Sequence, residues 1–248
     1  MTIAVRAFSL AIGLVFGLFQ TGYIVGKAKG VDLRKHGSGN SGTTNAVRVM
    51  GTKFGLLVLL GDALKTVFAM LIVFFTFGNA YPDLRLLLTV YAAMGAILSH
   101  DFPFYMHFKG GKGIACTAGL CTGFIIFNPL IWVITFIVFL IPFVTTKYVS
   151  LGSLCVYVAL VIEFIVFGQN GWLNIFGFEG VNSQSVLIEV YVIIFLLAVL
   201  AFFQHRKNIV RLVKGEESKT FLSKKKRDEY NKMRAEQEAA KAAQQKEN

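Results

Sequence analysis

The sequence predicts an all-α, polytopic membrane protein with seven transmembrane helices. Hydrophobic residues make up 55% of the 248 residues and charged residues only 16%, whereas a soluble domain usually carries about 25% charge. Several runs approach the roughly 20 residues that a helix needs to cross a bilayer core of about 30 Å. Lysine and arginine also fall unevenly between the loops that join these runs.

Seven apolar runs follow one another along the chain, at residues 3–25, 54–77, 84–100, 113–127, 130–145, 149–167 and 185–204. The first run is too long for a usual signal-peptide core, so we expect it to be kept as a span. The fourth is short, and only Asn128 and Pro129 separate it from the fifth. These two runs could therefore form one hairpin or a broken pair.

The placement of basic residues predicts the orientation. One side of the membrane receives the 26–53 loop with six lysines and arginines, the lysines after the third and fifth runs, and the basic tail after Gln204. The other side receives two isolated arginines and the 168–184 loop, which has none. Because basic loops stay in the cytoplasm, we expect the N-terminus outside and the C-terminus inside, as an odd number of spans requires. The expected location is a cell membrane that the chain crosses several times.

The chain divides into a membrane domain, residues 1–214, and a basic, polar cytoplasmic tail, residues 215–248. The tail is rich in Lys, Glu, Ala and Gln and has no core-forming apolar stripe, which is typical of a solvated helix or a disordered extension. Its basic cluster at 224–227 could contact anionic lipid headgroups or could merely solubilise the chain. The three cysteines have no metal-ligand spacing, and we expect no metal, no cofactor and no nucleic-acid partner.

Three polar, glycine-rich segments are the informative part of the sequence, at residues 37–48, 100–113 and 205–217. In the predicted topology all three lie at the cytoplasmic ends of spans. We therefore expect them to meet in one site.

The first segment, GSGNSGTTN, contains the pattern G-x-G-x-x-G of dinucleotide-binding turns. That pattern needs a preceding strand and a following helix in a βαβ unit, but residues 31–35 make a poor strand and the next element is a membrane span. A Walker loop is also absent from the sequence. The glycines are therefore expected to let backbone N–H groups approach a phosphate outside any nucleotide-binding fold.

The other two segments add cations and hydrogen-bond donors. Lys109 and Lys112 flank a pair of glycines, while His205 and Asn208 are three residues apart and so share a helical face. Carboxylates are almost missing from the three segments. Because a phosphate monoester carries about −1.5 to −2 charges at neutral pH, this composition favours a site for one or more phosphates.

Taken in order, these segments resemble the motifs of the bacterial acyl-phosphate–glycerol-3-phosphate acyltransferases, the PlsY type of integral membrane enzyme. The resemblance covers residues 1 to about 217. The matching positions are Ser38, Gly39, Asn40, Gly42, Thr44, Asn45 and Arg48, then His100, Phe102, Pro103 and 108–113, then His205, Arg206, Asn208, Ile209, Arg211 and Leu212. Ser41 stands where the family usually has proline, and the tail is longer than the family's.

The resemblance implies that a fatty acyl group moves from acyl phosphate to the 1-hydroxyl of glycerol 3-phosphate, releasing lysophosphatidic acid and inorganic phosphate. It implies a lipid bilayer around the enzyme and a separate enzyme that supplies acyl phosphate. The predicted catalytic residues are Ser38, Arg48, Lys112, His205 and Asn208. The predicted phosphate-binding residues are Gly37, Gly39, Asn40, Gly42, Thr44, Asn45, His100, Lys109, Gly110, Gly111, Gly113 and Ser150.

Two questions stay open at this level. His205 could act as a general base, or it could only position a substrate while an oxygen of the acyl phosphate accepts the hydroxyl proton; the resemblance favours the second. Asp62 and Lys65 lie three apart inside a span, where charged residues are usually functional, but an ion pair that braces helices is the favoured interpretation. A transporter of a phosphorylated metabolite is the alternative function, although transporters usually bind substrate between repeats near the bilayer midplane.

Overall fold

The computed structural model describes residues 2–177 and 183–247, with side chains to residue 237, and every regular element in these ranges is helical. Its α-helices are α1 (Thr2–Gly17), α2 (Thr21–Ala28), α3 (Thr43–Met50), α4 (Thr52–Phe77), α5 (Arg85–Asp101), α6 (Ile114–Gly123), α7 (Pro129–Thr146), α8 (Val149–Gln169), α9 (Gln184–Gln204), α10 (Arg206–Val213) and α11 (Lys224–Glu247). Single 3₁₀ turns are η1 (Leu33–Lys35), η2 (Pro82–Leu84), η3 (Phe104–Met106), η4 (Phe124–Ile126) and η5 (Trp172–Asn174).

Six segments of the described chain are helical, long and apolar enough to cross a membrane: Thr2–Ala28, Thr52–Phe77, Pro82–Met106, Pro129–Thr146, Val149–Gln169 and Gln184–Gln204. They coincide with six of the seven predicted runs, which confirms a helical, multi-span membrane architecture. The fourth predicted run forms a shorter apolar helix, Ile114–Ile126, so the number seven stays a prediction. Residues 178–182 of the predicted 168–184 loop lie outside the described residues.

The first span is two helices rather than the single run that the sequence predicts. α1 ends at Gly17 and α2 begins at Thr21, which leaves carbonyl groups near the break without helical partners. Lys65 Nζ of α4 binds two of them, the oxygens of Gly17 at 3.3 Å and of Phe19 at 2.6 Å. The break is therefore held by a side chain from another helix, which hydropathy along the first run cannot reveal.

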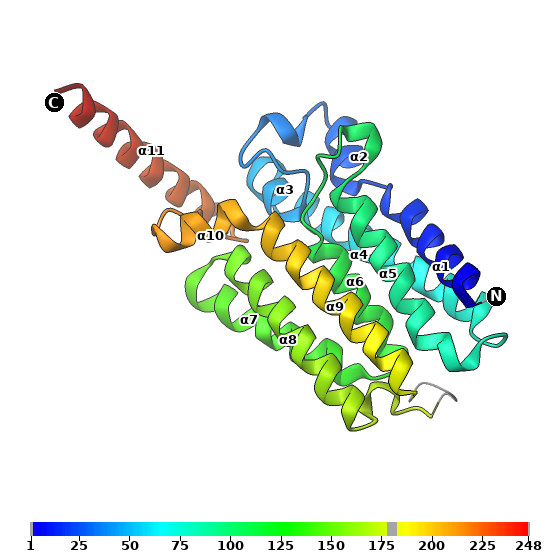
Figure 1. Ribbon diagram of the computed structural model, residues 1–248. Coiled ribbons are helices and arrows are strands. Elements are labelled where there is room, and N and C mark those ends of the chain that lie inside the picture. Colours follow the sequence, from blue (N-terminus) through cyan, green and yellow to red (C-terminus); the bar gives the residue numbers. More distant parts are fainter. Residues whose placement is uncertain (1, 178–182, 248) are drawn as a thin grey trace.

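Helix α5 lies at the centre of the bundle, and α1 packs along it through glycines (Figure 1). A Cβ atom on Gly13 would lie 2.0 Å from the carbonyl oxygen of Ala92, and one on Gly17 would lie 2.2 Å from that of Ala96. Gly95 of α5 meets the backbone of Leu10 in the same way. These small residues let the two backbones approach closely, as is common between membrane helices.

Helix α6 is short and is enclosed by its neighbours. Phe124 and Phe127, at its C-terminal end, are completely buried. Beyond them, the Asn128 side chain donates a hydrogen bond of 2.6 Å to the carbonyl of Trp172, in the connection between α8 and α9. The chain thus passes through the interior between the loop that precedes α6 and the far end of the bundle.

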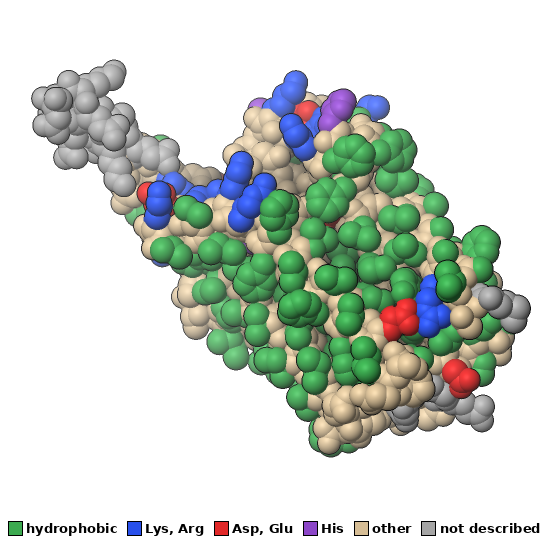
Figure 2. Space-filling model, in the orientation of Figure 1, with side chains coloured by type: hydrophobic (Ala, Val, Ile, Leu, Met, Phe, Trp, Pro, Cys, Tyr) green, Lys and Arg blue, Asp and Glu red, His purple; other side chains and the backbone are tan. Residues whose placement is uncertain are grey.

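The surface separates into an apolar flank and a basic end. Hydrophobic side chains cover the flank of the bundle, whereas lysines and arginines gather at the end where α2, α3 and α10 lie (Figures 1 and 2). The flank includes exposed Phe8, Phe68 and Phe195, as expected for side chains that face lipid.

The tail leaves the bundle at this basic end. After α10, residues 217–222 run without regular structure and are called the strap from here on. α11 follows and projects away from the bundle (Figure 1). Arg227 of α11 donates to the Thr52 hydroxyl at 3.2 Å, and the Tyr230 hydroxyl accepts from the Lys219 amide at 3.2 Å.

Candidate active site

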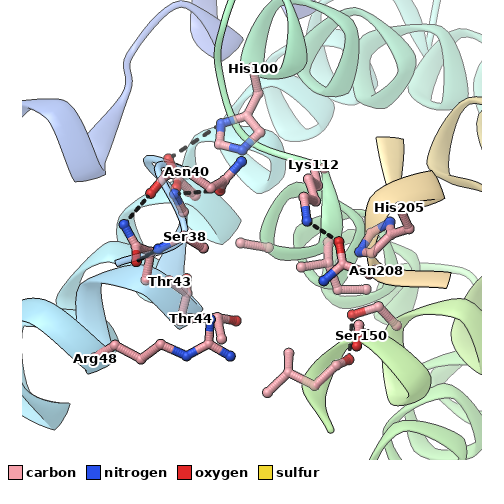
Figure 3. Close-up of a pocket in the computed structure, with 18 of the residues that line it drawn as sticks. Ser38, Asn40, Thr43, Thr44, Arg48, His100, Lys112, Ser150, His205 and Asn208 are labelled. Atoms are coloured by element: carbon pink, nitrogen blue, oxygen red, sulfur yellow. Dashed lines mark hydrogen bonds and ion pairs between the residues drawn. The ribbon is translucent and has the colours of Figure 1, made fainter. Parts of the chain in front are cut away.

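A polar cavity of about 70 Å³ lies at the basic end of the bundle and is lined by all three glycine-rich segments. Its labelled residues face one another across a gap (Figure 3). The loop and α3 provide one side, with Ser38, Asn40, Thr43, Thr44 and Arg48. The opposite side carries Lys112, Ser150, His205 and Asn208. Segments far apart in sequence, such as those that contain Ser38 and His205, thus contribute to one site.

The conformation of the first loop depends on Asn45. Its Nδ2 atom lies 2.8 to 3.0 Å from the carbonyl oxygens of Leu33, His36 and Asn40, and its Oδ1 accepts from the Ser38 amide at 2.8 Å. Gly37, with φ of 61°, lies so close that a Cβ atom there would come within 2.2 Å of this oxygen. Asn45 therefore fixes the loop around itself and leaves no polar atom free for a substrate.

Two glycines of the second loop serve close packing against His100. A Cβ atom on Gly110 would lie 2.0 Å from the His100 carbonyl oxygen, and one on Gly111 would lie 1.9 Å from the His100 Nε2 atom. Their amides donate to the carbonyls of Asp101 and His100, both at 3.1 Å. In this conformation these two N–H groups are occupied, so the cation that the loop presents to the cavity is Lys112.

Lys112 begins a chain of hydrogen bonds along the second side of the cavity. Its ammonium donates to Oδ1 of Asn208, whose Nδ2 donates to Glu217 at 2.8 Å. Glu217 also accepts from the Ser150 hydroxyl at 3.1 Å and from Arg211 at 2.8 Å. Burial, together with the positive charge of Arg211, lowers the pKa of Lys112 to about 8, so it is largely charged at neutral pH.

His205 has a defined tautomer. Its Nδ1 lies 2.8 Å from the carbonyl oxygen of Ala201, which can only accept; Nδ1 therefore carries the proton, and in the neutral ring Nε2 is an acceptor. Burial, with Lys112 nearby, lowers the pKa of His205 to about 4. The imidazole is consequently neutral at physiological pH and is a weak base.

Arg48 and Thr43 have unused hydrogen-bonding capacity. Arg48 Nη2 contacts the Ser218 carbonyl at 3.0 Å and the Thr220 hydroxyl at 3.2 Å, while its buried Nε has no partner among the described residues. The buried hydroxyl of Thr43 is likewise unpartnered. Burial lowers the pKa of Arg48, but a guanidinium stays charged in proteins. These groups are available to an anion.

Asp62 and His100 belong to a second charged cluster at the edge of the cavity, which also contains Lys65 and is called the brace below. Lys65 Nζ lies 2.9 Å from Asp62 Oδ1 and 2.9 Å from His100 Nδ1, in addition to its two contacts at the break in the first span. Asp62 also accepts from the Thr21 hydroxyl at 2.9 Å. The brace joins four helices, α1, α2, α4 and α5, which supports the structural interpretation of the Asp62–Lys65 pair.

Most of the residues predicted from the sequence line the polar cavity. Those that do are Ser38, Asn40, Gly42, Thr44, Asn45, Arg48, His100, Lys112, Gly113, Ser150, His205 and Asn208. Those that do not are Gly37, Gly39, Lys109, Gly110 and Gly111; the glycines shape the loops, and Lys109 is exposed. For all of these residues the substrate-binding or catalytic role stays a prediction.

Sequence reasoning missed Thr43 and Glu217. Glu217 is 5% exposed and contradicts the expectation that carboxylates are almost missing from the site. Its position two residues after Gly215, among many basic residues, was the available signal. The Thr43 hydroxyl lines the cavity and makes no hydrogen bond at the start of α3.

An apolar groove of about 340 Å³ adjoins the polar cavity. Thr43, Thr44, Ile114 and Val149 line both spaces. From this junction the groove follows α6 and α7, past Phe143, Phe139, Phe136 and Trp132. From residue 132 to residue 143 the helix advances by eleven steps, which correspond to roughly 16 Å at 1.5 Å per residue.

Comparison with known proteins gives a consistent result. The profile of the glycerol-3-phosphate acyltransferase family matches residues 7–215. The glycerol-3-phosphate acyltransferase of Mycoplasmopsis agalactiae is 34% identical over 226 residues, covering 85% of this chain and 92% of that protein. The enzyme of the same name from Bacillus subtilis is 34% identical over 214 residues, covering 86% and 96%.

Solved structures agree with these relatives. A crystal structure of PlsY, an integral membrane glycerol 3-phosphate acyltransferase, in its glycerol 3-phosphate form matches with a TM-score of 0.70 and 30% identity, covering 87% of this chain and 96% of that chain. The lysophosphatidic acid form of PlsY matches with a TM-score of 0.69 and 28% identity, covering 88% and 96%.

Proposed function

The chain belongs to the glycerol-3-phosphate acyltransferase family as an integral membrane acyltransferase of the PlsY type, and on that premise we propose that its donor is an acyl phosphate. The observation that carries the proposal is the junction of the two spaces. A cavity lined by Arg48 and Lys112 suits phosphate groups, and it opens at Thr43 and Thr44 into a groove that suits an acyl chain. A long-chain acyl phosphate has these two parts.

In the proposed reaction the C1 hydroxyl oxygen of glycerol 3-phosphate attacks the acyl carbonyl carbon. The new ester bond forms as the bond from carbon to the phosphate oxygen breaks, which gives lysophosphatidic acid and inorganic phosphate. Lys112 and the N–H groups at the start of α3 would stabilise the acyl phosphate and the developing oxyanion. Arg48, Ser38 and Asn208 would hold the phosphate of the acceptor, so that two mutually repelling anions are aligned.

We assign His205 a positioning role. Its neutral Nε2 can accept a hydrogen bond from the attacking hydroxyl, but a pKa of about 4 makes it a poor base near neutral pH. The leaving phosphate, which must gain charge as the bond breaks, is the stronger acceptor for the hydroxyl proton. The acyl phosphate therefore assists the reaction by taking the proton from the hydroxyl group of glycerol 3-phosphate.

We further propose that the site faces the cytoplasm, with seven crossings and the N-terminus outside. The basic end of the bundle carries the site, and α6 with η4 links this end to Asn128 at the other, which supports counting it as a short crossing. The division into residues 1–214 and 215–248 is kept, and a separate enzyme would supply the acyl phosphate. Labelling of single cysteines at positions 39 and 79 from either side of sealed vesicles would test the orientation, since the two should react from opposite sides.

A direct assay tests the reaction. The purified protein is given palmitoyl phosphate and glycerol 3-phosphate, phosphate release is followed, and lysophosphatidic acid is identified by mass spectrometry. Palmitoyl-coenzyme A replaces the acyl phosphate in a parallel reaction. Product from palmitoyl phosphate alone is expected; product only from the thioester would overturn the donor proposal, and uptake of glycerol 3-phosphate into vesicles without chemical change would favour a transporter.

A further inference from the structure

The strap lies beyond the part of the chain that matches the family, which ends at residue 215, yet it is built into the site. Glu217 lines the polar cavity, while Thr220 and Leu222 line the apolar groove. Thr220 is 3% exposed. A merely solubilising tail would not contribute buried side chains to both spaces.

The strap joins the two walls of the groove at its cytoplasmic end. On one wall, the Thr220 hydroxyl and the Ser218 carbonyl accept from Arg48 of α3. On the other wall, the Thr220 amide donates to the carbonyl of Lys147, directly after α7, at 2.9 Å. Thr220 alone thus connects the candidate phosphate-binding arginine to the helix that lines the groove.

Contacts with α4 and α11 keep the strap in this position. The Thr52 hydroxyl donates to the Leu222 carbonyl at 2.6 Å, and Arg234 donates to the Ser218 hydroxyl at 2.7 Å. The ring of Phe221 packs on that of Tyr230 with centroids 5.3 Å apart. Alternate residues therefore have different surroundings: Thr220 and Leu222 reach the groove, whereas Lys219 is exposed.

We propose that the strap is part of the acyl-donor site. Leu222 and Thr220 form the cytoplasmic wall against which the first carbons of the acyl chain lie, and Thr220 is a positioning residue that directs the Arg48 guanidinium into the polar cavity. This rests on the proposed function, because it takes the apolar groove as the place of the acyl chain. With the strap closing the cytoplasmic end, the acyl donor enters sideways from the lipid.

The first experiment compares two variants of Thr220 in the full chain. Thr220→Val keeps the volume and the amide but removes one of the two strap acceptors of Arg48, whereas Thr220→Ser keeps the hydroxyl. Arg48 is proposed to hold the phosphate of glycerol 3-phosphate, and Thr220→Val removes a hydrogen bond from this charged group. kcat/KM for glycerol 3-phosphate, measured at saturating palmitoyl phosphate, should therefore fall about tenfold in Thr220→Val and stay near the wild-type value in Thr220→Ser. Equal values in all three proteins, or equal losses in both variants, would overturn the positioning role.

The second experiment detects the acyl chain without turnover. Leu222→Cys and the matched control Lys219→Cys, both in a Cys155→Ser background, are labelled with a maleimide in the absence of glycerol 3-phosphate. Palmitoyl phosphate should slow labelling at position 222 and leave position 219 unchanged. Equal labelling with and without palmitoyl phosphate at position 222 would remove the strap from the donor site.

The two proposals fail in different ways. If the wild-type protein turns over palmitoyl phosphate but position 222 is unprotected, the strap proposal fails and the reaction stands. If position 222 is protected but no lysophosphatidic acid forms, the acyl chain binds at the strap and the proposed reaction fails.

Discussion

The brace and the polar cavity are neighbouring clusters built from the same kinds of residue, and they differ in how completely their charges are partnered. In the brace, Lys65 has four acceptors within 3.3 Å, and its charge is balanced by Asp62. In the cavity, the carboxylate nearest to Arg48 and Lys112 along the hydrogen-bonded chain, Glu217, is already bound to Arg211. Arg48 Nε and the Thr43 hydroxyl have no partner there.

The degree to which buried charges have partners distinguishes a structural cluster from a candidate binding site more clearly than the types of residue do. A buried charge that lacks its partner is costly, so a protein retains such a group where a ligand will complete it. The brace has its partners within the protein, whereas the cavity keeps unpartnered groups that the proposed anionic substrates would complete. Mutations should therefore affect stability at the first cluster and turnover at the second.

The largest effect is expected at the brace. Lys65→Met leaves the Asp62 carboxylate buried without its cation, which costs about 3–5 kcal/mol and should lower the apparent Tm in detergent by several degrees. Adding Asp62→Asn should restore part of that loss, because the unpaired charge is removed. An unchanged Tm combined with abolished turnover would instead indicate that Lys65 is catalytic, and it would contradict the assignment of the brace as a structural cluster.

The next effect is expected at Lys112. Lys112→Met should lower kcat/KM by about 10²–10³, which is typical for the removal of one group that stabilises transition-state charge, with little change in Tm. Lys109→Met is the matched control, because Lys109 is an exposed lysine only three residues away, and its kinetics should stay within about twofold of wild type. Similar losses in both variants would mean that the loop acts through its overall charge.

The pH dependence of kcat/KM should show whether the charge of Lys112 is needed for turnover. The pKa of Lys112 is lowered to about 8, so its cation is present below that pH and is lost as the pH rises through it. kcat/KM should therefore decline above about pH 8, by up to tenfold per unit. Lys112→Arg should move this decline to higher pH, and a decline at the same pH in that variant would assign it to another group.

His205 should contribute no acid limb near pH 6.5, since its lowered pKa of about 4 keeps it neutral above that value. A phosphate monoester titrates near pH 6, so a limb there belongs to the substrate and should persist in His205→Asn if that variant retains activity. A limb that disappears in His205→Asn would restore the general-base role.

The smallest effect is expected at the far end of the groove. Trp132→Ala lengthens the apolar space at the end distant from the polar cavity, so kcat/KM should rise for acyl phosphates two or four carbons longer than palmitoyl relative to palmitoyl itself. Discrimination by one methylene in an apolar pocket is typically about tenfold or somewhat more. Leu56→Ala at the near end is the control and should leave the ratio unchanged.

The sequence could predict the membrane architecture because a bilayer allows few solutions. A span needs its own length of apolar residues, and loop charge fixes its direction, so six spans were found from composition alone. The polar cavity was predictable for a similar reason. Polar, glycine-rich motifs at the ends of spans on one side of the membrane are expected to meet in a binding site. Eleven of the predicted residues that line the cavity belong to the three motifs, and Ser150 is the twelfth.

Features that depend on contacts between distant residues were not predictable. The break after Gly17 is held by Lys65, and the close approach of Gly111 to His100 depends on how two segments meet. The position of the strap was unpredictable for the same reason. Residues 217–222 have the composition of a solvated tail, and they line the apolar groove only because they contact Arg48 and Lys147. Composition indicates whether a segment lies in lipid or in water, but it does not predict which residues that segment contacts.

The glycine contact between α1 and α5 has a consequence for membrane insertion. Gly13 and Gly17 meet their partners on α5 only after the third span has been synthesised, and Lys65 on the second span needs the carbonyls exposed at the end of α1. Helix α1 can therefore take its final position only once α4 and α5 are in the membrane, and Lys65 of α4 gains these carbonyl acceptors only when α1 is packed there. Any substitution that enlarges Gly13 should accordingly reduce the amount of protein that reaches the membrane before it affects a single catalytic step.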